Sequence, residues 1–394
     1  MRILIISFQA VTNDGPLGMA CIGLSLAEQL TAAGYEVELV VSSVGGFPTT
    51  ATVRPVSAWA KYYQKGLAFC EARLGLATYR KRYVEERLFD RLCKKWIGPD
   101  VDLVISTNSF LPQTTAAARA RGVPVVLMPG NPNDLVLADL VGRLAAQHGL
   151  AGHVDAYRYE PRLEMFRETL ANVTHVFCYS RVIDRSFEQA IPDRARHVRP
   201  AMLKFRALSP QSFVPDQITF GYLGYTVLLK GLDVLLEAWN TVHSRSGARL
   251  VIAGPIDPAV RSQIEKHGAA GRTGVVFAQR VDDLAAFFAK CSVLVVPSHI
   301  DGQPAVAVEA MASARPVIVT SACGVADFVE DREEGIVVPP ADPTALGAAM
   351  QWFIDDPRRV AACGRRARDA YDRFSFDDYI KTLSRDMVEI ATHA

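Results

Sequence analysis

The chain has 394 residues, of which 49% are hydrophobic, and a formal net charge of +1 at pH 7. This length exceeds one ordinary hydrophobic core, so two domains are expected, and the balanced charge excludes a molecule-wide field for binding nucleic acid. The seven cysteines are scattered without a C-x-x-C pair, and no apolar run approaches the ~20 residues of a membrane span. The start, MRILIISF, is too short for a signal peptide. We therefore expect a cytoplasmic protein, either free or at the inner face of the membrane.

The first half of the chain alternates apolar runs with helical patterns. After the strand-like run 2–8 and a glycine-containing loop, a helix is predicted from Ile22, Leu26 and Leu30 at fourfold spacing, with Gly34 as its stop. Further strand-like runs follow at 36–43, 101–107, 123–130 and 174–180. Continuous apolar strands that alternate with helices predict a parallel sheet covered on both faces.

The second half repeats this order after a break. Residues 203–217 interrupt the rhythm with prolines and polar residues. Strand-like runs then alternate with predicted helices at 232–243, 282–290 and 305–313, and the end of the chain, 356–394, is helical. The predicted organisation is an N-terminal domain at 1–205, a linker at 206–217, a second domain at 218–370, and a helical segment at 371–394 that packs back on the first domain.

Residues 54–96 interleave basic and aromatic side chains, as in KYYQK and TYRKRY. A solvated pair of amphipathic helices would produce this pattern. A surface that touches anionic lipid or a lipid-linked substrate would also produce it. Nucleic acid is not expected as a partner, because nothing else in the chain supports it.

The stretch PSHIDGQPAVAVEAMAS at 297–313 places two acids in an apolar setting. Asp301 lies in a loop after a buried strand, and Pro304 suits the first turn of the following helix. Loop amides and the positive end of that helix favour a phosphate or clustered hydroxyls. Glu309 lies inside the helix among small apolar residues and needs hydrogen-bond donors. A vicinal diol such as a ribose offers two donors, and an ion pair with Arg315 is the structural alternative.

Taken together, PSHIDGQPAVAVEAMASARPVI resembles the signature of the retaining group 1 glycosyltransferases, family 4, which have the GT-B fold. The segments ITFGYLGYTVLLKGLDVLLEA, ARLVIAGP and SACGVADFVEDREEGIVVPPADPTAL extend the resemblance over residues 218–350. The first half of the chain resembles the family only at its edges, in the segments RILIISF, GPLG and AEQLTAAGYEVELV. The resemblance implies two Rossmann-like, doubly wound parallel-sheet domains that face a central cleft and bind a nucleotide-diphosphate sugar there.

The resemblance also implies residue roles. Glu309 matches the acid that holds the ribose diol, Asp301 the acid at the sugar ring, and Lys230 the lysine that neutralises the diphosphate. Asp301 and Lys230 are therefore the expected catalytic residues. The loops expected to lie against the donor comprise Gly302, Gln303 and Pro304 in the second domain, and Gly15 to Gly18, with the amides of Leu17 and Gly18, in the first.

The sequence departs from the family pattern at several positions. Asp301 replaces the usual Glu, and Tyr225 replaces the Arg that follows the loop glycine. Arg280 or Arg199, near predicted strand ends, would substitute for that missing cation. Other departures lie at Ala314, at Cys323 to Asp327, and at Asn131 to Asp134, where the family often has a loop that contains histidine.

The remaining candidates concern donor and acceptor contacts. His299, which is close in sequence to Asp301, and Tyr225 are candidate donor contacts. Asn131, Asn133 and Asp134 follow an apolar strand, and either face the cleft as acceptor ligands or form an Asx-rich turn. His153 is a candidate general base, with an ordinary surface histidine as the alternative.

The predicted function is a retaining, metal-independent glycosyltransferase that moves a sugar from a nucleotide donor to an alcohol. The acceptor would be a lipid-linked, polysaccharide or natural-product intermediate. No cofactor is expected, because the sequence offers no evident carboxylate cluster suited to Mg²⁺. The alternatives are a non-catalytic nucleotide-sugar-binding protein and another GT-B enzyme, such as a nucleotide-sugar epimerase or a phosphorylase.

Overall fold

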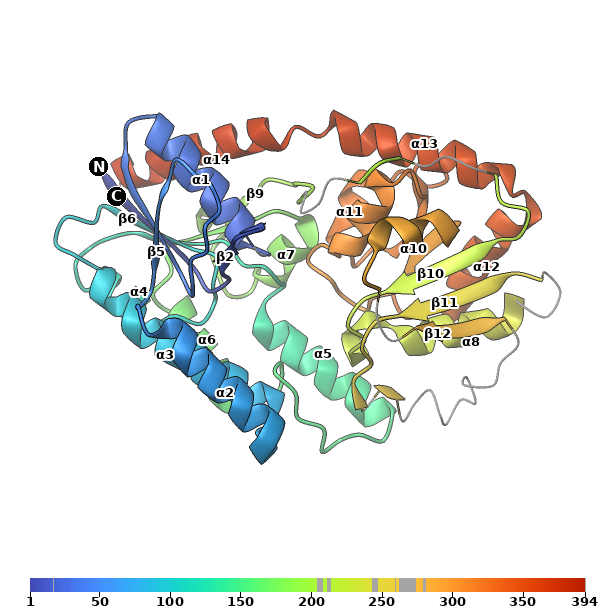
Figure 1. Cartoon of the computed structure of the whole chain (residues 1–394), viewed down its shortest axis with the longest axis horizontal. Helices are drawn as coiled ribbons and strands as arrows, with labels where there is room; N and C mark the ends of the chain where they lie inside the picture. Colours follow the sequence, from blue (N-terminus) through green and yellow to red (C-terminus); the bar gives the residue numbers. More distant parts are fainter. Residues whose placement is uncertain are drawn as a thin grey trace.

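The computed structural model shows two α/β domains, each built on a parallel sheet (Figure 1). It describes residues 1–393 except 17, 204–207, 211–213, 243–246, 259, 262–273 and 279–280. Parts of the predicted linker at 206–217 therefore lie outside the described residues. No described helix combines the length and the apolar character that crossing a bilayer requires.

The first domain is organised around a seven-stranded sheet of order β5-β4-β1-β6-β7-β8-β9. The strands are β1 (Arg2–Ser7), β4 (Glu36–Val41), β5 (Thr52–Pro55), β6 (Leu103–Ser106), β7 (Val125–Leu127), β8 (His175–Cys178) and β9 (Arg196–Val198). A short hairpin precedes the first helix and pairs β2 (Val11–Thr12) with β3 (Gly15–Pro16). The central strand β1 is buried over five of its six residues, which explains its unbroken apolar sequence.

Seven helices accompany this sheet in the described part of the first domain. They are α1 (Ala20–Ala32), α2 (Ala60–Leu74), α3 (Thr78–Cys93), α4 (Pro112–Arg119), α5 (Asp134–Gln147), α6 (Glu160–Leu170) and α7 (Arg181–Ser186). The basic and aromatic segment 54–96 forms the antiparallel pair α2 and α3, which lies at the lower left in Figure 1.

The second domain has a six-stranded sheet of order β12-β11-β10-β13-β14-β15. The strands are β10 (Thr219–Leu223), β11 (Arg249–Ala253), β12 (Val275–Ala278), β13 (Val293–Val296), β14 (Val317–Thr320) and β15 (Gly335–Val338). Its described helical elements are the 3-10 turns η3 (Leu228–Lys230) and η6 (Gly324–Phe328) and the helices α8 (Leu232–Val242), α10 (Leu284–Lys290), α11 (Ala305–Ala312), α12 (Pro343–Asp355) and α13 (Arg358–Arg373).

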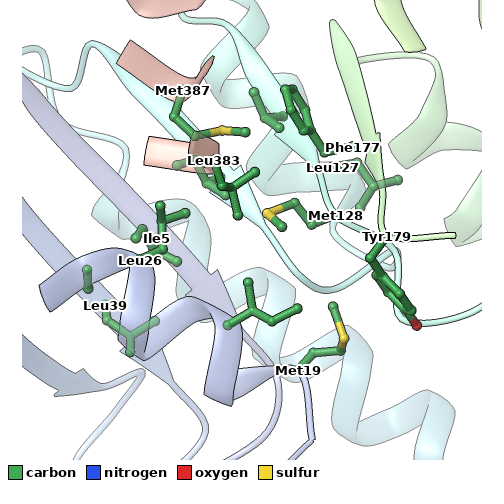
Figure 2. Packing of buried hydrophobic residues seen from close by; sticks show 14 of the residues in the cluster. Ile5, Met19, Leu26, Leu39, Leu127, Met128, Phe177, Tyr179, Leu383 and Met387 are labelled. Carbon is green, nitrogen blue, oxygen red and sulfur yellow. The ribbon is translucent and has the colours of Figure 1, made fainter. Parts of the chain in front are cut away.

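The last helix, α14 (Phe376–His393), returns to the first domain and lies beside α1 (Figure 1). Its buried residues Leu383 and Met387 enter the same hydrophobic cluster as Ile5 and Leu26. Figure 2 shows these side chains pointing into that cluster with Phe177. The C-terminal segment is therefore part of the core of the first domain.

Helix α5 connects the two domains through its apolar face. Leu137, Val141, Leu144 and Ala145 recur at helical spacing and are buried, and they pack in the hydrophobic cluster of the second domain. Figure 1 shows α5 running from the first domain to the second. The position of α5 thus couples the two domains, although the helix directly follows β7 of the first.

Candidate active site

The centre of the candidate site is an ion pair between Lys230 and Asp301. The Lys230 Nζ donates to the Asp301 Oδ2, and the Asp301 carboxylate is only 8% exposed. Burial alone would lower the pKa of Lys230, but the Asp301 charge outweighs this effect and raises it. The lysine is therefore a permanent cation at neutral pH, although its charge is shared with a carboxylate.

Backbone geometry delivers both residues to the same point. Lys230 ends η3, and Gly231 follows in the left-handed region at φ 65°. A Cβ on Gly231 would lie 2.1 Å from the carbonyl oxygen of Pro297, at the end of β13, so only glycine allows this approach. The loop with Asp301 is held by backbone bonds from Asp301 N to Ala322 O at 2.9 Å and from Gly324 N to Asp301 O at 3.0 Å.

The start of α11 and the side chain of Glu309 face the same space. Pro304 immediately precedes α11, and Pro304, Ala305, Val306 and Glu309 all line a cavity that Lys230 and Asp301 also line. Glu309 is the one charged residue of this eight-residue helix and is partly buried. Arg315, the alternative ion-pair partner, donates from Nε to Phe288 O at 2.7 Å. The positive end of a helix, a lysine and two carboxylates therefore converge on one cavity.

This cavity has a volume of about 900 Å³ and is lined by both domains. The second domain contributes the ends of β10 and β13 together with the residues above. The first domain contributes the beginning of α3 and the segment 153–157. The space lies at the carboxyl edge of the second sheet, where ligands bind in doubly wound folds. Its volume suits a nucleotide sugar.

Of the other predicted donor contacts, Tyr225 lines the cavity, whereas the Gln303 side chain forms hydrogen bonds with the backbone of another segment of the chain. Tyr225 is 55% exposed, and its hydroxyl lies 3.4 Å from the Asp257 carboxylate. The Gln303 side chain accepts from Leu203 N at 2.8 Å and donates to Ala201 O. Gln303 therefore holds the segment that leaves the first domain.

Gly302 lies at the contact between the domains. Its carbonyl accepts a hydrogen bond of 2.8 Å from the hydroxyl of Ser180, which caps α7. A Cβ on Gly302 would lie 3.0 Å from Ile183 and 3.3 Å from the carbonyl of Gly130. The backbone of the Asp301 loop thus packs directly on the first domain.

The other predicted donor contacts lie away from the described cavity lining or beyond the described residues. The His299 ring points at Asp233 of α8, with Nε2 and Oδ1 3.7 Å apart. Gly18 precedes α1 with φ 48° and packs against Gln9. Leu17 and Arg280 lie outside the described residues. Arg199, proposed as a substitute cation, pairs with Asp386 of α14 at 3.2 Å instead.

The carboxylate of Asp233 joins the two domains. It accepts from the His148 ring at the end of α5 at 3.0 Å, while His299 faces its other oxygen. Burial alone would raise the pKa of Asp233, but the two histidines overcome that effect and hold it well below its ordinary value.

Among the acceptor-side candidates, His153 alone lines the cavity within the described part of the chain. The Asn133 side chain caps α5 by accepting from Leu135 N at 2.9 Å, as in the Asx-turn alternative. Asp134 is buried and pairs with Arg162 at 3.2 Å. Burial raises the pKa of Asp134 even though Arg162 opposes the shift. Asn131 is exposed and is not among the lining residues.

Sequence reasoning missed most of the lining residues of the first domain, among them Tyr79, Arg82 and Tyr157. Tyr79 and Arg82 belong to the basic and aromatic segment, which was interpreted only as a surface. Their helical spacing of three places them on one face of α3. Tyr157 lies in an irregular segment, where no periodicity signals its environment.

The described residues contain no group of three or more metal-ligating side chains that could hold an ion. The described residues that line the cavity include one arginine, Arg82, and one lysine, Lys230. An anion in this space would therefore meet one cation from each domain, Arg82 from the first and Lys230 from the second.

The comparisons with known proteins agree with this geometry. Residues 217–356 match the family model described as glycosyl transferases group 1. An uncharacterized glycosyltransferase of Methanocaldococcus jannaschii is 24% identical over 66% of this chain and 73% of its own length. D-inositol 3-phosphate glycosyltransferase 2 of Catenulispora acidiphila is 30% identical over 41% of each chain. The chain spans less than half the length of most of the curated relatives that it matches.

A solved structure extends the likeness to the whole chain. HepE of Anabaena, solved in complex with UDP and glucose, superposes with a TM-score of 0.61 at 16% identity and covers 99% of both chains. This likeness shows the fold. Residues 217–356 therefore match the group 1 glycosyltransferases, and the two parallel-sheet domains of the chain form the GT-B fold.

Proposed function

We propose that this protein is a retaining glycosyltransferase that transfers a sugar from a nucleotide-diphosphate donor to an alcohol acceptor. One observation carries the proposal. Lys230, Asp301, Glu309 and the start of α11 line a single cavity between the two domains. HepE was solved with UDP and glucose, which supports a nucleotide-sugar donor for a chain of the same fold.

The chemistry suits the residues. Cleavage of the bond between sugar and phosphate passes through an oxocarbenium-like transition state while the leaving diphosphate gains charge. Lys230 and the amides at the start of α11 would stabilise that charge, and loss of one such donor typically costs about 10²–10³ in rate. Glu309 would accept hydrogen bonds from the two ribose hydroxyls. Asp301 would position the sugar beside Lys230.

A thermal-shift screen against UDP, GDP, ADP, TDP and their sugars tests the donor assignment. A nucleotide that binds the folded state raises the melting temperature by an amount that grows as its concentration exceeds its Kd. We expect Glu309→Ala to abolish the shift, and Asp301→Ala to keep donor binding but reduce turnover. Equal calorimetric affinity of the wild type and Glu309→Ala for the donor would refute the ribose assignment.

Slow hydrolysis of the donor separates a transferase from the alternative, a non-catalytic nucleotide-sugar-binding protein. The alternative is kept because Tyr225, a neutral side chain, stands where the family has a phosphate-binding arginine. A transferase releases some sugar to water without an acceptor, whereas a sensor does not. Binding without any hydrolysis by the wild type would favour the sensor.

We also propose that the face formed by α2 and α3 contacts an anionic membrane surface, so that the acceptor would be lipid-linked or a polysaccharide intermediate. Trp59, Tyr62 and Phe69 are 72%, 56% and 61% exposed, and exposed cations such as Lys65 and Arg73 lie beside them. Aromatic rings and cations on one face favour the interface of anionic lipids. In co-sedimentation, binding should require anionic vesicles and weaken with salt. Equal failure to sediment with anionic and neutral vesicles at low salt would remove this preference.

A further inference from the structure

The wall of the cavity that the first domain supplies contains features that the donor assignment does not use. Arg82 and Tyr79 come from the beginning of α3, and Tyr157 comes from the segment before α6. The donor contacts proposed above from described lining residues, Lys230, Asp301 and Glu309, lie in the second domain. The first-domain wall therefore faces the space left for the acceptor.

Arg82 is held at one edge and open at the other. Its Nε donates to the Glu86 Oε1 at 3.0 Å, and its side chain is 48% exposed at the cavity. Glu86 is itself 1% exposed and also accepts two bonds from Arg162, at 2.7 and 3.1 Å. The contact through Nε orients the guanidinium and leaves its terminal nitrogens for a second oxyanion.

The start of α3 adds to the positive potential. Its N-cap, Ala77, makes no side-chain cap bond, and its first turn has no acidic residue. Instead, Arg80, Lys81 and Arg82 follow one another near the positive end of the helix dipole, where cations are unfavourable unless an anion is close. Lys81 pairs with Glu71 on α2.

Tyr157 lines the cavity together with both cations, Lys230 and Arg82. Burial raises the pKa of the Tyr157 phenol, and Lys230 and then Arg82 act in the opposite direction. Both charges therefore act on the same hydroxyl, from different domains. A ligand that contacts Tyr157 would lie in the field of both, with an alcohol directed to Asp301 and an anionic group directed to Arg82.

We propose that the first-domain wall is a subsite for an acceptor that carries an oxyanion, and that Arg82 binds this group. The oxyanion is a phosphate monoester or a carboxylate, of a soluble sugar or of a lipid head group. Tyr79 and Tyr157 provide aromatic faces for the rest of the acceptor. This inference rests on the proposed transferase function and specifies which acceptors the site selects.

The test compares anionic and neutral probes on the protein saturated with the nucleotide found in the screen. Glucose 6-phosphate, glucuronate and a short-chain phosphatidic acid are the anionic probes, and glucose is the neutral one. At least one anionic probe should raise the melting temperature of the wild type, and glucose should not. The probe that acts distinguishes the sources of the oxyanion.

Arg82→Gln should weaken binding of that probe at least fivefold while the Kd of the nucleotide stays within about twofold of the wild type. Arg82→Lys should restore part of the affinity. The matched control is Arg87→Gln, because Arg87 is an exposed cation of the same helix that bonds to Tyr83 and is not among the cavity-lining residues. It should behave as the wild type. Urea unfolding of each variant monitors the fold.

Three results would overturn the inference. The first is equal affinity of the wild type and Arg82→Gln for the anionic probe. The second is that no anionic probe binds better than glucose. The third is a tenfold loss of nucleotide affinity in Arg82→Gln, which would assign Arg82 to the donor. If no nucleotide binds at all, the donor proposal fails instead. The anionic probes are then compared on the unliganded protein, where the same criteria decide the subsite.

Discussion

Replacement of Asp301 by asparagine should separate nucleotide affinity from turnover. In the structure, the Lys230 ammonium is paired with the Asp301 carboxylate at the cavity. A diphosphate that binds Lys230 must share the lysine with this carboxylate or displace it. Asp301→Asn removes the competing charge but keeps the size of the side chain. We therefore expect the nucleoside diphosphate to bind more tightly and the donor to turn over more slowly.

The magnitude follows from the exposure of the pair. Two unit charges about 4 Å apart interact by about 4 kcal/mol at an effective dielectric constant near 20. The Lys230 side chain is 36% exposed, so solvent screening reduces the effect. Exposed pairs are worth about 1 kcal/mol or less, which corresponds to at most about a fivefold change in Kd. Lys230→Met, which removes the cation, should instead weaken the nucleotide about tenfold or more.

Titration calorimetry with the nucleoside diphosphate, together with donor hydrolysis rates, measures both effects. Pro304→Ala is a useful comparison because it changes the same loop without changing charge. If Asp301→Asn binds the diphosphate more weakly than the wild type, the lysine is not shared between carboxylate and phosphate. The electrostatic reasoning would then be wrong.

Three further predictions concern the contacts that hold the site. Gln303→Ala leaves two backbone groups of the segment that leaves the first domain without their partner, so the free energy of unfolding in urea should fall by about 2–4 kcal/mol. Arg162→Met leaves the Glu86 carboxylate buried without its forked partner and should cost about 3–5 kcal/mol in the same measurement; a loss below about 1 kcal/mol would contradict this role. Asp233→Asn should cost about 1–2 kcal/mol at pH 7, because it removes a charged partner of His148. Since the pKa of Asp233 is lowered in the folded state, its contribution is present in full above the ordinary carboxyl pKa near 4 and is lost progressively as pH falls toward the lowered pKa of the folded state. The stabilities of wild type and Asp233→Asn should therefore begin to converge below about pH 5 and should continue to converge below about pH 3.

Much of the fold follows from local patterns. Strands such as β1 and β6 are buried on both faces, so their sequences are continuously apolar and were predicted within a few residues. Helix α11 was predicted at 305–313 and spans Ala305–Ala312, because Pro304 marks its start. These signals lie in consecutive residues, and the family resemblance added the roles of Lys230, Asp301 and Glu309.

Contacts between distant segments could not be predicted in this way. Asp134 follows a strand, which is the position expected of a residue that faces the cleft. Its actual partner, Arg162, is 28 positions away on another helix. The apolar face of α5 indicates that the helix packs against a hydrophobic core, yet only the structure shows that this core is that of the second domain. Arg82 looked like one cation among many in a basic segment.

The sequence by itself therefore determined the alternation of strands and helices, the two-domain organisation and the motif that carries the proposed donor residues. These properties depend on hydrophobic periodicity and on backbone preferences over short spans. Only the tertiary structure decided which charges meet. The Lys230–Asp301 pair, the Gln303 contacts with the first domain and the position of Arg82 at the cavity all depend on how α3, α5 and the loop after β13 pack together. That packing is set by burial across the whole chain, which no local pattern encodes.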